Sequence, residues 1–437
     1  MLEAAALIAG LGIIFYPGTP LMTCLGFSLV AFAVTSFMIP RVGPLFIKTG
    51  LKGRDLAKKQ PQPEIPETMG AVTGTVYMFC MLFFIPYIFY QYLVTTTSGS
   101  GNRDAGIEVN YGRQLHHFPH NKLAEYLSAL LCLQSMLMLG VADDLFDIRW
   151  RNKFFLPAIA AIPLLIVYYV DFGVTAVMLP PFLNMGTTID LGPLYYVYMA
   201  SVAIFCPNSI NIYAGVNGLE VGQTIVIGAV VLLNDMLYLL TPEHPATESH
   251  LLSAFLVIPF MGVALALLRY NWYPSKVFVG DTFCYFSGMV FAVGGILGHF
   301  SKTLLLFFIP QVFNFCYSVP QLFKFIDCPR HRMPVYNSDT GLLEPSTVEL
   351  KTTKEPIIKV LKLLNWLGLI GMYPPQKEGE YLRVSNMTLI NLALVRLGPK
   401  REDRLVMTLL GLQLLCGLGA IAIRHSVAIL VFGRDNL

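Results

Sequence analysis

The sequence predicts an all-α polytopic membrane protein with about ten transmembrane helices and a small mixed subdomain between the last two. Of the 437 residues, 55% are hydrophobic and only 13% are charged, whereas soluble domains carry roughly 25% charged residues. Several apolar runs are long enough, at about 18–25 residues, to cross ~30 Å of hydrocarbon as a helix. These runs are continuously apolar and do not alternate, which argues against a β-barrel.

Ten apolar runs are candidate spans, at 20–39, 70–94, 123–141, 155–170, 192–206, 221–240, 251–269, 282–299, 302–326 and 406–432. A further run, 4–16, could extend the first span with a break at the sequence YPGTP. We therefore expect 1–326 to hold nine spans and their loops. Residues 327–405 should form the subdomain, and 406–437 the last span and tail.

Lysine and arginine concentrate on one side of these spans. Five connectors join odd spans to the even spans that follow them, at 41–68, 142–154, 207–220, 270–281 and 327–405. The first holds six basic residues, the second three and the last twelve, whereas the opposite loops 171–191 and 241–250 hold none. The positive-inside rule places the five connectors in the cytosol. With ten spans, both termini would lie at the opposite face.

The connector 142–154 is highly charged for a short loop between apolar runs. Asp143 and Asp144 are adjacent, and Arg149 and Lys153 follow. Paired carboxylates can bind Mg²⁺, accept a proton or orient a nucleophile, and the cations could meet a phosphate. Ordinary solvated charge near a helix end is the alternative, and the local sequence does not decide between the two.

The stretch 206–223 is polar and punctuated by glycines. It contains Asn211, Asn217 and Glu220 around Gly215. This pattern favours backbone that approaches a ligand closely, and carboxamides can offer oxygen to a metal or hydrogen-bond a base. A tight loop that uses Gly and Asn for turns is the alternative.

The connectors 270–281 and 327–405 also carry side chains that could bind a nucleotide or phosphate. Asp281 precedes an apolar run, where it could be only a helix N-cap. Phe278 could stack on a base or pack in the membrane. The sequence CPRHRMP holds Arg330, His331 and Arg332, whose guanidinium forks suit phosphate. The alternative for this cluster is a positive anchor at the end of the ninth span.

Together, the connectors supply carboxylates, carboxamides and cations at one membrane face. This inventory suits a Mg²⁺-bound diphosphate whose charge is neutralised by cations. The sequence has no Walker A, kinase or dinucleotide motif, so we expect loops at the membrane surface to hold the substrates, one of them a lipid. A transporter is the alternative from another class, and it should show internal repeats and polar residues at mid-span.

Five segments together resemble the polyprenyl-phosphate N-acetylhexosamine-1-phosphate transferase family: GVADDLFDIRWRNKFFLP, NSINIYAGVNGLEVGQ, NWYPSKVFVGDTFCYFSGM, GILGHFSKTLLLFFIPQVFNF and CPRHRMP. The resemblance is to its eukaryotic members, and it implies a ten-span, dimeric enzyme of the endoplasmic reticulum membrane with a cytosol-facing site. The implied reaction transfers GlcNAc-1-phosphate from UDP-GlcNAc to dolichyl phosphate, requires Mg²⁺ and is inhibited by tunicamycin. It begins the lipid-linked oligosaccharide for N-glycosylation. A bacterial-type enzyme that uses undecaprenyl phosphate is the alternative within the family.

The resemblance also implies catalytic and metal-holding residues. Asn211 and Asp281 match the pair that holds the metal. Asp143 and Asp144 match the acidic pair that positions or deprotonates the acceptor phosphate, and Lys153 matches a phosphate contact. We expect direct attack of the acceptor on the phosphorus bonded to GlcNAc, although a double displacement through an aspartyl-phosphate also fits the sequence.

Seven further positions match substrate contacts of the family: Glu67, Gly215, Asn217, Phe278, Arg330, His331 and Arg332. In this scheme the Phe278 ring stacks on uracil, and the arginines contact phosphate or sugar. Two residues depart from the family pattern. Asn152 stands where His is common, and Tyr213, inside the nucleotide loop, could alter packing there.

Overall fold

The computed structural model describes residues 2–16, 18–95, 119–179, 188–329, 332–350, 355–374 and 382–432. Its helices are α1 (Leu2–Phe15), α2 (Pro20–Lys48), α3 (Met69–Thr95), α4 (His120–Phe146), α5 (Trp150–Lys153), α6 (Leu156–Ala160), α7 (Ile162–Asp171), α8 (Pro193–Ile212), α9 (Leu219–Leu239), α10 (Thr247–Asn271), α11 (Gly280–Leu297), α12 (Ser301–Phe307), α13 (Ile309–Leu322), α14 (Glu355–Trp366), α15 (Leu389–Leu397) and α16 (Glu402–Phe432). Its strands are β1 (Lys52–Arg54), β2 (Glu64–Pro66), β3 (Ala176–Met178), β4 (Thr188–Asp190), β5 (Val335–Asn337), β6 (Leu342–Glu344), β7 (Thr347–Leu350), β8 (Met372–Tyr373) and β9 (Leu382–Ser385).

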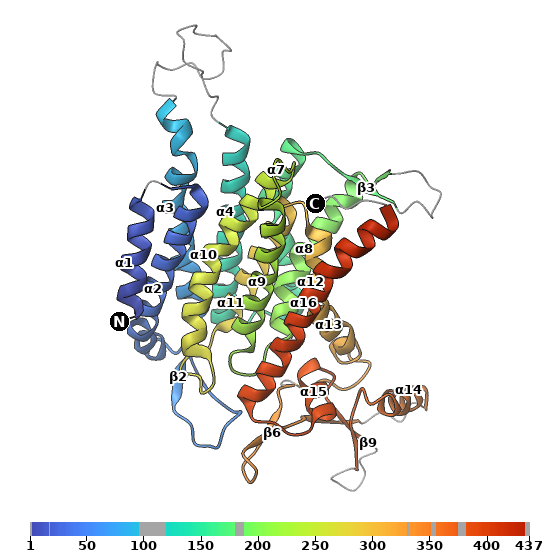
Figure 1. Ribbon diagram of the computed structural model, residues 1–437. Helices are drawn as coiled ribbons and strands as arrows, with labels where there is room; N and C mark the ends of the chain where they lie inside the picture. Colours follow the sequence, from blue (N-terminus) through green and yellow to red (C-terminus); the bar gives the residue numbers. More distant parts are fainter. Residues whose placement is uncertain are drawn as a thin grey trace.

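The long helices form one bundle (Figure 1). Within the described ranges, eight helical segments are long and apolar enough to cross a membrane, or nine if the bent pair α12 and α13 forms one span. The predicted span 192–206 is also helical, as α8, although it is not among those eight. The predicted class, a helical polytopic membrane protein, is confirmed.

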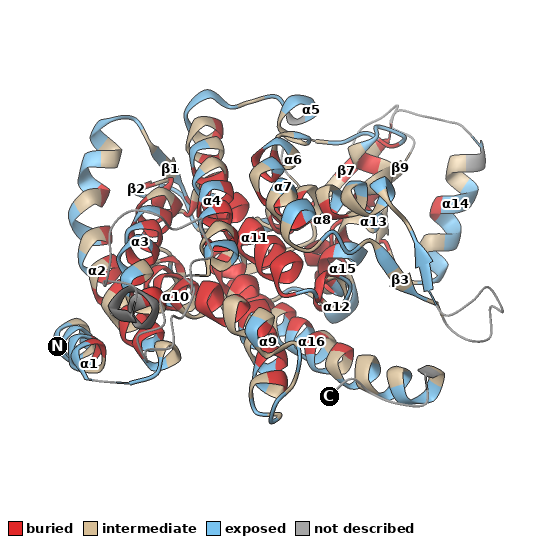
Figure 2. Ribbon diagram, turned by 90° about the horizontal axis from the view of Figure 1, so that it is seen from above, coloured by how far each residue is buried: buried red, intermediate tan, exposed pale blue. Residues whose placement is uncertain are grey.

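Helix α11 runs through the middle of the bundle and is buried all round (Figure 2). Every residue from Thr282 to Leu297 is buried, as expected for a helix without a polar face. Glycines allow its neighbours to approach closely. A Cβ on Gly288 would lie 2.4 Å from Cα of Pro207 on α8, and one on Gly140 of α4 would lie 2.5 Å from Cα of Thr282. This packing fixes the position of the N-terminal end of α11.

The N-terminal segment differs from the sequence prediction. Helix α1 does not extend α2 but packs back along it, with Gly10 against Gly26. Glu3 forms an ion pair of 2.9 Å with Arg269, near the end of α10. The N-terminus therefore lies at the end of the bundle where connector 270–281 begins, and the prediction that both termini lie at the opposite face is wrong. The predicted span count left out α1, because its 14 residues are fewer than the roughly 20 that a span usually needs.

The five connectors gather at one end of the bundle, which we call the connector face (the lower end in Figure 1). Three small antiparallel sheets lie there, β1–β2, β5–β6 and β7-β9-β8. The last two sheets, with α14 and α15, give 327–405 the mixed structure that was predicted. Leu361 and Val384 belong to one buried cluster in its core. Tyr213 joins this part to the bundle, because it is buried in a cluster with Leu389.

Replacing Gly288 with alanine should destabilise the bundle, because the new methyl group would meet the backbone of Pro207 at 2.4 Å. Overpacking of this kind costs about 1–3 kcal/mol, so the melting temperature in detergent should fall. Gly411→Ala on α16 is the matched control, since nothing lies within 4 Å of its added Cβ. Equal melting temperatures for the two variants would mean that α8 and α11 do not pack this closely.

Candidate active site

A cavity of about 690 Å³ opens at the connector face. Every connector contributes to its wall, with Glu67, Lys153, Asn217, Asp281 and Arg332 as one example from each. Small-molecule sites typically enclose about 300–1,000 Å³. Connectors far apart in sequence therefore form one site of suitable size.

Asp144, near the end of α4, holds the N-terminal end of α11. One of its carboxylate oxygens accepts the backbone N–H of Asp281 at 2.7 Å, and the other accepts the backbone N–H and the hydroxyl of Thr282. The first N–H groups of a helix lack partners within it, and a carboxylate satisfies them and complements the helix dipole. Gly280 permits this contact, because it has a φ of +74° and a Cβ there would lie 2.3 Å from Asp144.

Lys153 lies between two carboxylates. Its Nζ is 2.7 Å from Asp143 and 2.9 Å from Asp281. The side chain of Asp143 is 1% exposed and that of Asp281 is 34% exposed, so the second is the one that a ligand can reach. The other oxygen of Asp143 accepts the backbone N–H of Ile148, which fixes the turn after α4. An ammonium has three donors, so Lys153 retains one for a ligand.

Asn211 and Glu67 also line the cavity beside Asp281. The Asn211 side chain interacts with that of Asp281. Burial, and then the charge of Asp281, raise the pKa of Glu67. Amide and carboxylate oxygens suit a hard cation, and Mg²⁺ usually takes one or two protein carboxylates and completes its shell with water and phosphate. In the described part of the chain no cluster of three or more His, Cys, Asp or Glu could hold a metal. Asp281 and Asn211 offer the oxygen atoms that such a hard cation prefers.

An aromatic wall stands on one side of the cavity. The ring of Phe278 packs on β1, since a Cβ on Gly53 would lie 3.0 Å from two ring carbons. The backbone N–H of Phe278 donates to Pro66 at 2.8 Å, which ties it to the first connector. Gly215 lines the same cavity and has a φ of +132°, a conformation that favours glycine. A ring and an open backbone in one cavity suit a planar ligand.

Arg332 reaches the cavity from the subdomain. Its backbone carbonyl accepts hydrogen bonds from the Asn391 amide at 2.8 Å and the Ser346 hydroxyl at 3.2 Å. Its Nη1 atom is buried, and among the described residues nothing bonds to it. A buried charge without a partner is costly, so this nitrogen indicates a place for an anion.

Known proteins are similar in sequence to nearly the whole chain. The model for glycosyl transferase family 4 matches residues 126–299. The UDP-N-acetylglucosamine–dolichyl-phosphate N-acetylglucosaminephosphotransferase of Saccharomyces cerevisiae is 57% identical over 424 residues, which are 95% of this chain and 94% of that protein. The chain belongs to the family of these N-acetylglucosaminephosphotransferases. The protein of the same name in Schizosaccharomyces pombe is 53% identical over 98% of this chain and 97% of its own. A phospho-N-acetylmuramoyl-pentapeptide-transferase of Thermoanaerobacter sp. is 28% identical over 37% of this chain.

Most of the residues predicted from the family resemblance lie together. Asp143 and Asp144 do not line the cavity but lie behind its wall, where they bind Lys153 and the start of α11. Arg330 and His331 lie outside the described residues. Asn152, one of the two departures from the family pattern, is exposed. Eight predicted residues line the cavity: Glu67, Lys153, Asn211, Gly215, Asn217, Phe278, Asp281 and Arg332.

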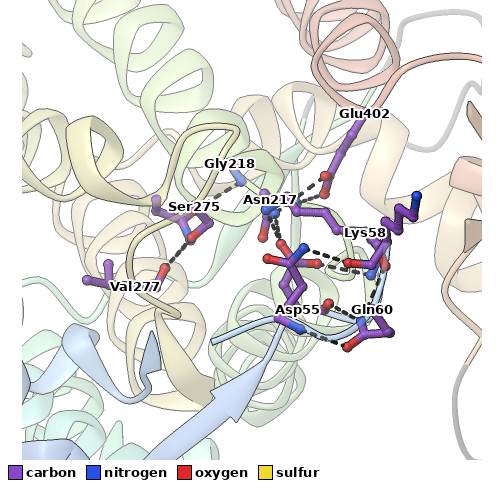
Figure 3. A network of polar contacts seen from close by, with 12 residues as sticks. Asp55, Lys58, Gln60, Asn217, Gly218, Ser275, Val277 and Glu402 are labelled. Atoms are coloured by element: carbon purple, nitrogen blue, oxygen red, sulfur yellow. Dashed lines mark hydrogen bonds and ion pairs between the residues drawn. The ribbon is translucent and has the colours of Figure 1, made fainter. Parts of the chain in front are cut away.

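Sequence reasoning missed two buried charged residues that line the cavity, Asp55 and Glu402. Figure 3 shows Asp55 and Glu402 against Asn217, and Lys58 forms an ion pair with Asp55. In sequence, Asp55 and Glu402 lie among lysines and arginines, a pattern typical of solvated surface charge. The fold shows the contrary, because Glu402 is only 3% exposed.

Replacing Lys153 with methionine should destabilise the protein, because Asp143 would be left buried without its cation. Loss of one partner of a buried ion pair costs about 3–5 kcal/mol. Adding Asp143→Asn should restore most of the melting temperature, since the buried side chain at position 143 is then uncharged. A double variant as unstable as the single one would show that Lys153 stabilises the fold by packing and not by charge.

Glu67→Gln should stabilise the protein at neutral pH. Since the pKa of Glu67 is raised in the fold, the folded state favours the protonated form, and wild-type stability is lost as pH rises through that pKa. The melting temperature of the variant should exceed that of the wild type at neutral pH and converge with it in acid.

Glu64→Gln is the control for this pH dependence. Lys52, with help from Arg54, lowers the pKa of Glu64, so its stabilising effect is present at neutral pH and is lost as pH falls. This variant should therefore be no more stable than the wild type at neutral pH. If the melting temperature of Glu67→Gln equals that of the wild type at every pH, burial does not destabilise the ionised form of Glu67.

Proposed function

We propose that this protein transfers GlcNAc-1-phosphate from UDP-GlcNAc to dolichyl phosphate, which gives GlcNAc-diphosphate-dolichol and UMP. This reaction begins the lipid-linked oligosaccharide for protein N-glycosylation. The observation that carries the proposal is the Lys153 ammonium held between two carboxylates in a cavity at the bundle end. It occurs in a chain that is 57% identical to an enzyme named for this reaction.

The nucleoside of the donor would lie at the aromatic wall. The Phe278 ring would stack on uracil, with Gly215 and Asn217 against the base. Glu67 would contact the nucleoside from the first connector. The support for these roles is that all four residues line one cavity.

The diphosphate and sugar would lie deeper, among the cations. Lys153 would use its third donor on a phosphate oxygen, and Arg332 would pair its buried Nη1 atom with the diphosphate or sugar. Arg330 and His331 would contact phosphate and the N-acetyl sugar. Fixed positive groups of this kind stabilise charge that spreads over a transferring phosphoryl group.

Mg²⁺ is the cofactor we propose, with Asp281 and Asn211 as its protein ligands. Their carboxylate and amide oxygens suit a hard cation that also binds phosphate. When bound, the ion would withdraw charge from the diphosphate and stabilise UMP as a leaving group.

The acceptor phosphate would attack the phosphorus bonded to GlcNAc directly, and the bond from that phosphorus to the UMP oxygen would break. A phosphate monoester has a second pKa of about 6 and is largely ionised at neutral pH, so a strong base is not required. Asp144 already binds the start of α11, which supports a positioning role. Asp143 is buried and bound to Lys153, which argues against it as the nucleophile of a two-step route.

We propose the endoplasmic reticulum membrane as the location, with the connector face in the cytosol. The lysine and arginine bias supports this orientation. We also propose a homodimer and inhibition by tunicamycin, both on the strength of the family resemblance. A nucleotide-sugar transporter is the alternative, but transporters bind substrate near the membrane midplane, whereas this cavity opens at one end of the bundle.

The reaction is tested with purified protein in detergent, dolichyl phosphate, Mg²⁺ and UDP-GlcNAc that carries ³²P in the phosphate bonded to the sugar. We expect the label in the lipid phase together with an equal amount of UMP. Release of UDP would indicate plain glycosyl transfer, and no labelled lipid from folded protein would contradict the proposal. Undecaprenyl phosphate in parallel tests the choice of acceptor.

Two carboxylate variants separate the proposed roles. Asp281→Asn should lower kcat about 100-fold or more, because a group that stabilises charge in the transition state is lost. Asp144→Asn should cost about tenfold or less, since an amide oxygen can still accept a helix N–H. Equal losses in the two variants would contradict the positioning role of Asp144.

A further inference from the structure

We propose that Asp55 and Glu402 are positioning residues that fix the orientation of the Asn217 carboxamide and thereby make the site selective for uracil over cytosine. The inference rests on the proposed function, because it requires the base of the donor to lie against Asn217. Neither carboxylate needs to touch the nucleotide itself.

Two carboxylates from opposite ends of the chain bond the Asn217 amide (Figure 3). Its Nδ2 atom donates to Asp55 at 2.7 Å and to Glu402 at 3.4 Å. Its backbone N–H donates to Glu402 at 2.7 Å. The three residues are buried, with exposed fractions of 7% for Asp55, 6% for Asn217 and 3% for Glu402.

The two carboxylates determine which end of the amide faces the ligand. An ionised carboxylate only accepts hydrogen bonds, whereas a carboxamide has a donating nitrogen and an accepting oxygen. With Asp55 and Glu402 on the same side, Nδ2 turns toward them, because a flipped amide would place Oδ1 against two acceptors in a buried site. No donor within the described ranges bonds Oδ1 of Asn217, and the residue lines the cavity. The oxygen is thus the end available to a base.

The carboxylates that hold Asn217 are themselves anchored. Asp55 forms an ion pair with Lys58, and its second oxygen accepts the backbone N–H of Ala57 at 3.0 Å. Glu402 is the first residue of α16, and one of its oxygens accepts the backbone N–H of Asn217 at 2.7 Å. The orientation of the amide is therefore fixed before a nucleotide binds.

An accepting oxygen that lies opposite N3 distinguishes the two pyrimidines. Uracil carries a hydrogen on N3 and donates, whereas N3 of cytosine has a lone pair and accepts. Oδ1 of Asn217 can bond the first and repels the second. A site built to hydrogen-bond a group rejects an analogue without it more strongly than an apolar pocket can.

Glu402→Gln tests this inference, because glutamine can also donate and so tolerates the flipped amide. Dissociation constants for UDP and CDP are measured by calorimetry at pH 8, together with kcat and KM for UDP-GlcNAc and CDP-GlcNAc. The wild type should prefer UDP by about 100-fold or more. In the variant this ratio should fall by about tenfold or more, the scale expected for one buried hydrogen bond, mainly through a higher KM for UDP-GlcNAc. Asp55→Asn should act in the same direction.

Asp403→Asn is the matched control, because Asp403 is the next residue of α16 and pairs with Arg401. It should keep the wild-type ratio. If Glu402→Gln does not fold, the ratio of UDP to CDP affinity in Asp55→Asn tests the inference in its place.

The outcomes separate this inference from the proposed reaction. A folded Glu402→Gln variant that loses affinity for UDP and CDP in parallel has a purely structural defect, and that result overturns the inference even if sugar-phosphate transfer proceeds. If the preference for UDP falls in the variant but the wild-type protein transfers no sugar phosphate, the inference is supported and only the proposed reaction is overturned. Wild-type protein that binds both nucleotides equally, or neither, overturns the inference.

Discussion

The contact between the Asp144 carboxylate and the N-terminal end of α11 is the constraint on which the rest of the site depends. Helix α11 is buried along its length, so its start has little freedom once the bundle is packed. Asp144 links that start to the end of α4 through the backbone N–H groups of Asp281 and Thr282. As a result, Asp281 is presented at a fixed point of the cavity, where Lys153 can reach both it and Asp143.

At several points around the cavity, as with Asp144 and Asp281, one side chain holds in place a residue that can contact a ligand. Asp143 holds Lys153, and Asn391 holds the backbone of Arg332. Asp55 and Glu402 hold the amide nitrogen of Asn217. Such preorganisation lets polar groups act on a substrate without reorganising when it binds. It also explains why a cavity with several carboxylates can suit a diphosphate, since most of the negative groups are already engaged.

The sequence alone was enough to predict the membrane class, the helical runs and eight residues that line the cavity. Apolar run length is a strong signal, and the connector motifs are specific to their family. The N-terminal turn could not be foreseen, because a short apolar run does not reveal whether it continues a span or folds back. Asp55 and Glu402 were missed because burial of a charged residue depends on contacts between distant segments. The inward or outward direction of Asp143 and Asp144 likewise became visible only in the fold.

Asp144 binds α11 while Asp281 faces the ligand, and a structure determined with Mn²⁺ and UDP tests this arrangement most directly. The metal should lie about 2 Å from oxygens of Asp281 and Asn211, with Asp144 still bonded to the backbone N–H groups at the start of α11. A metal bound instead by Asp143 and Asp144, with those helix contacts broken, would contradict it.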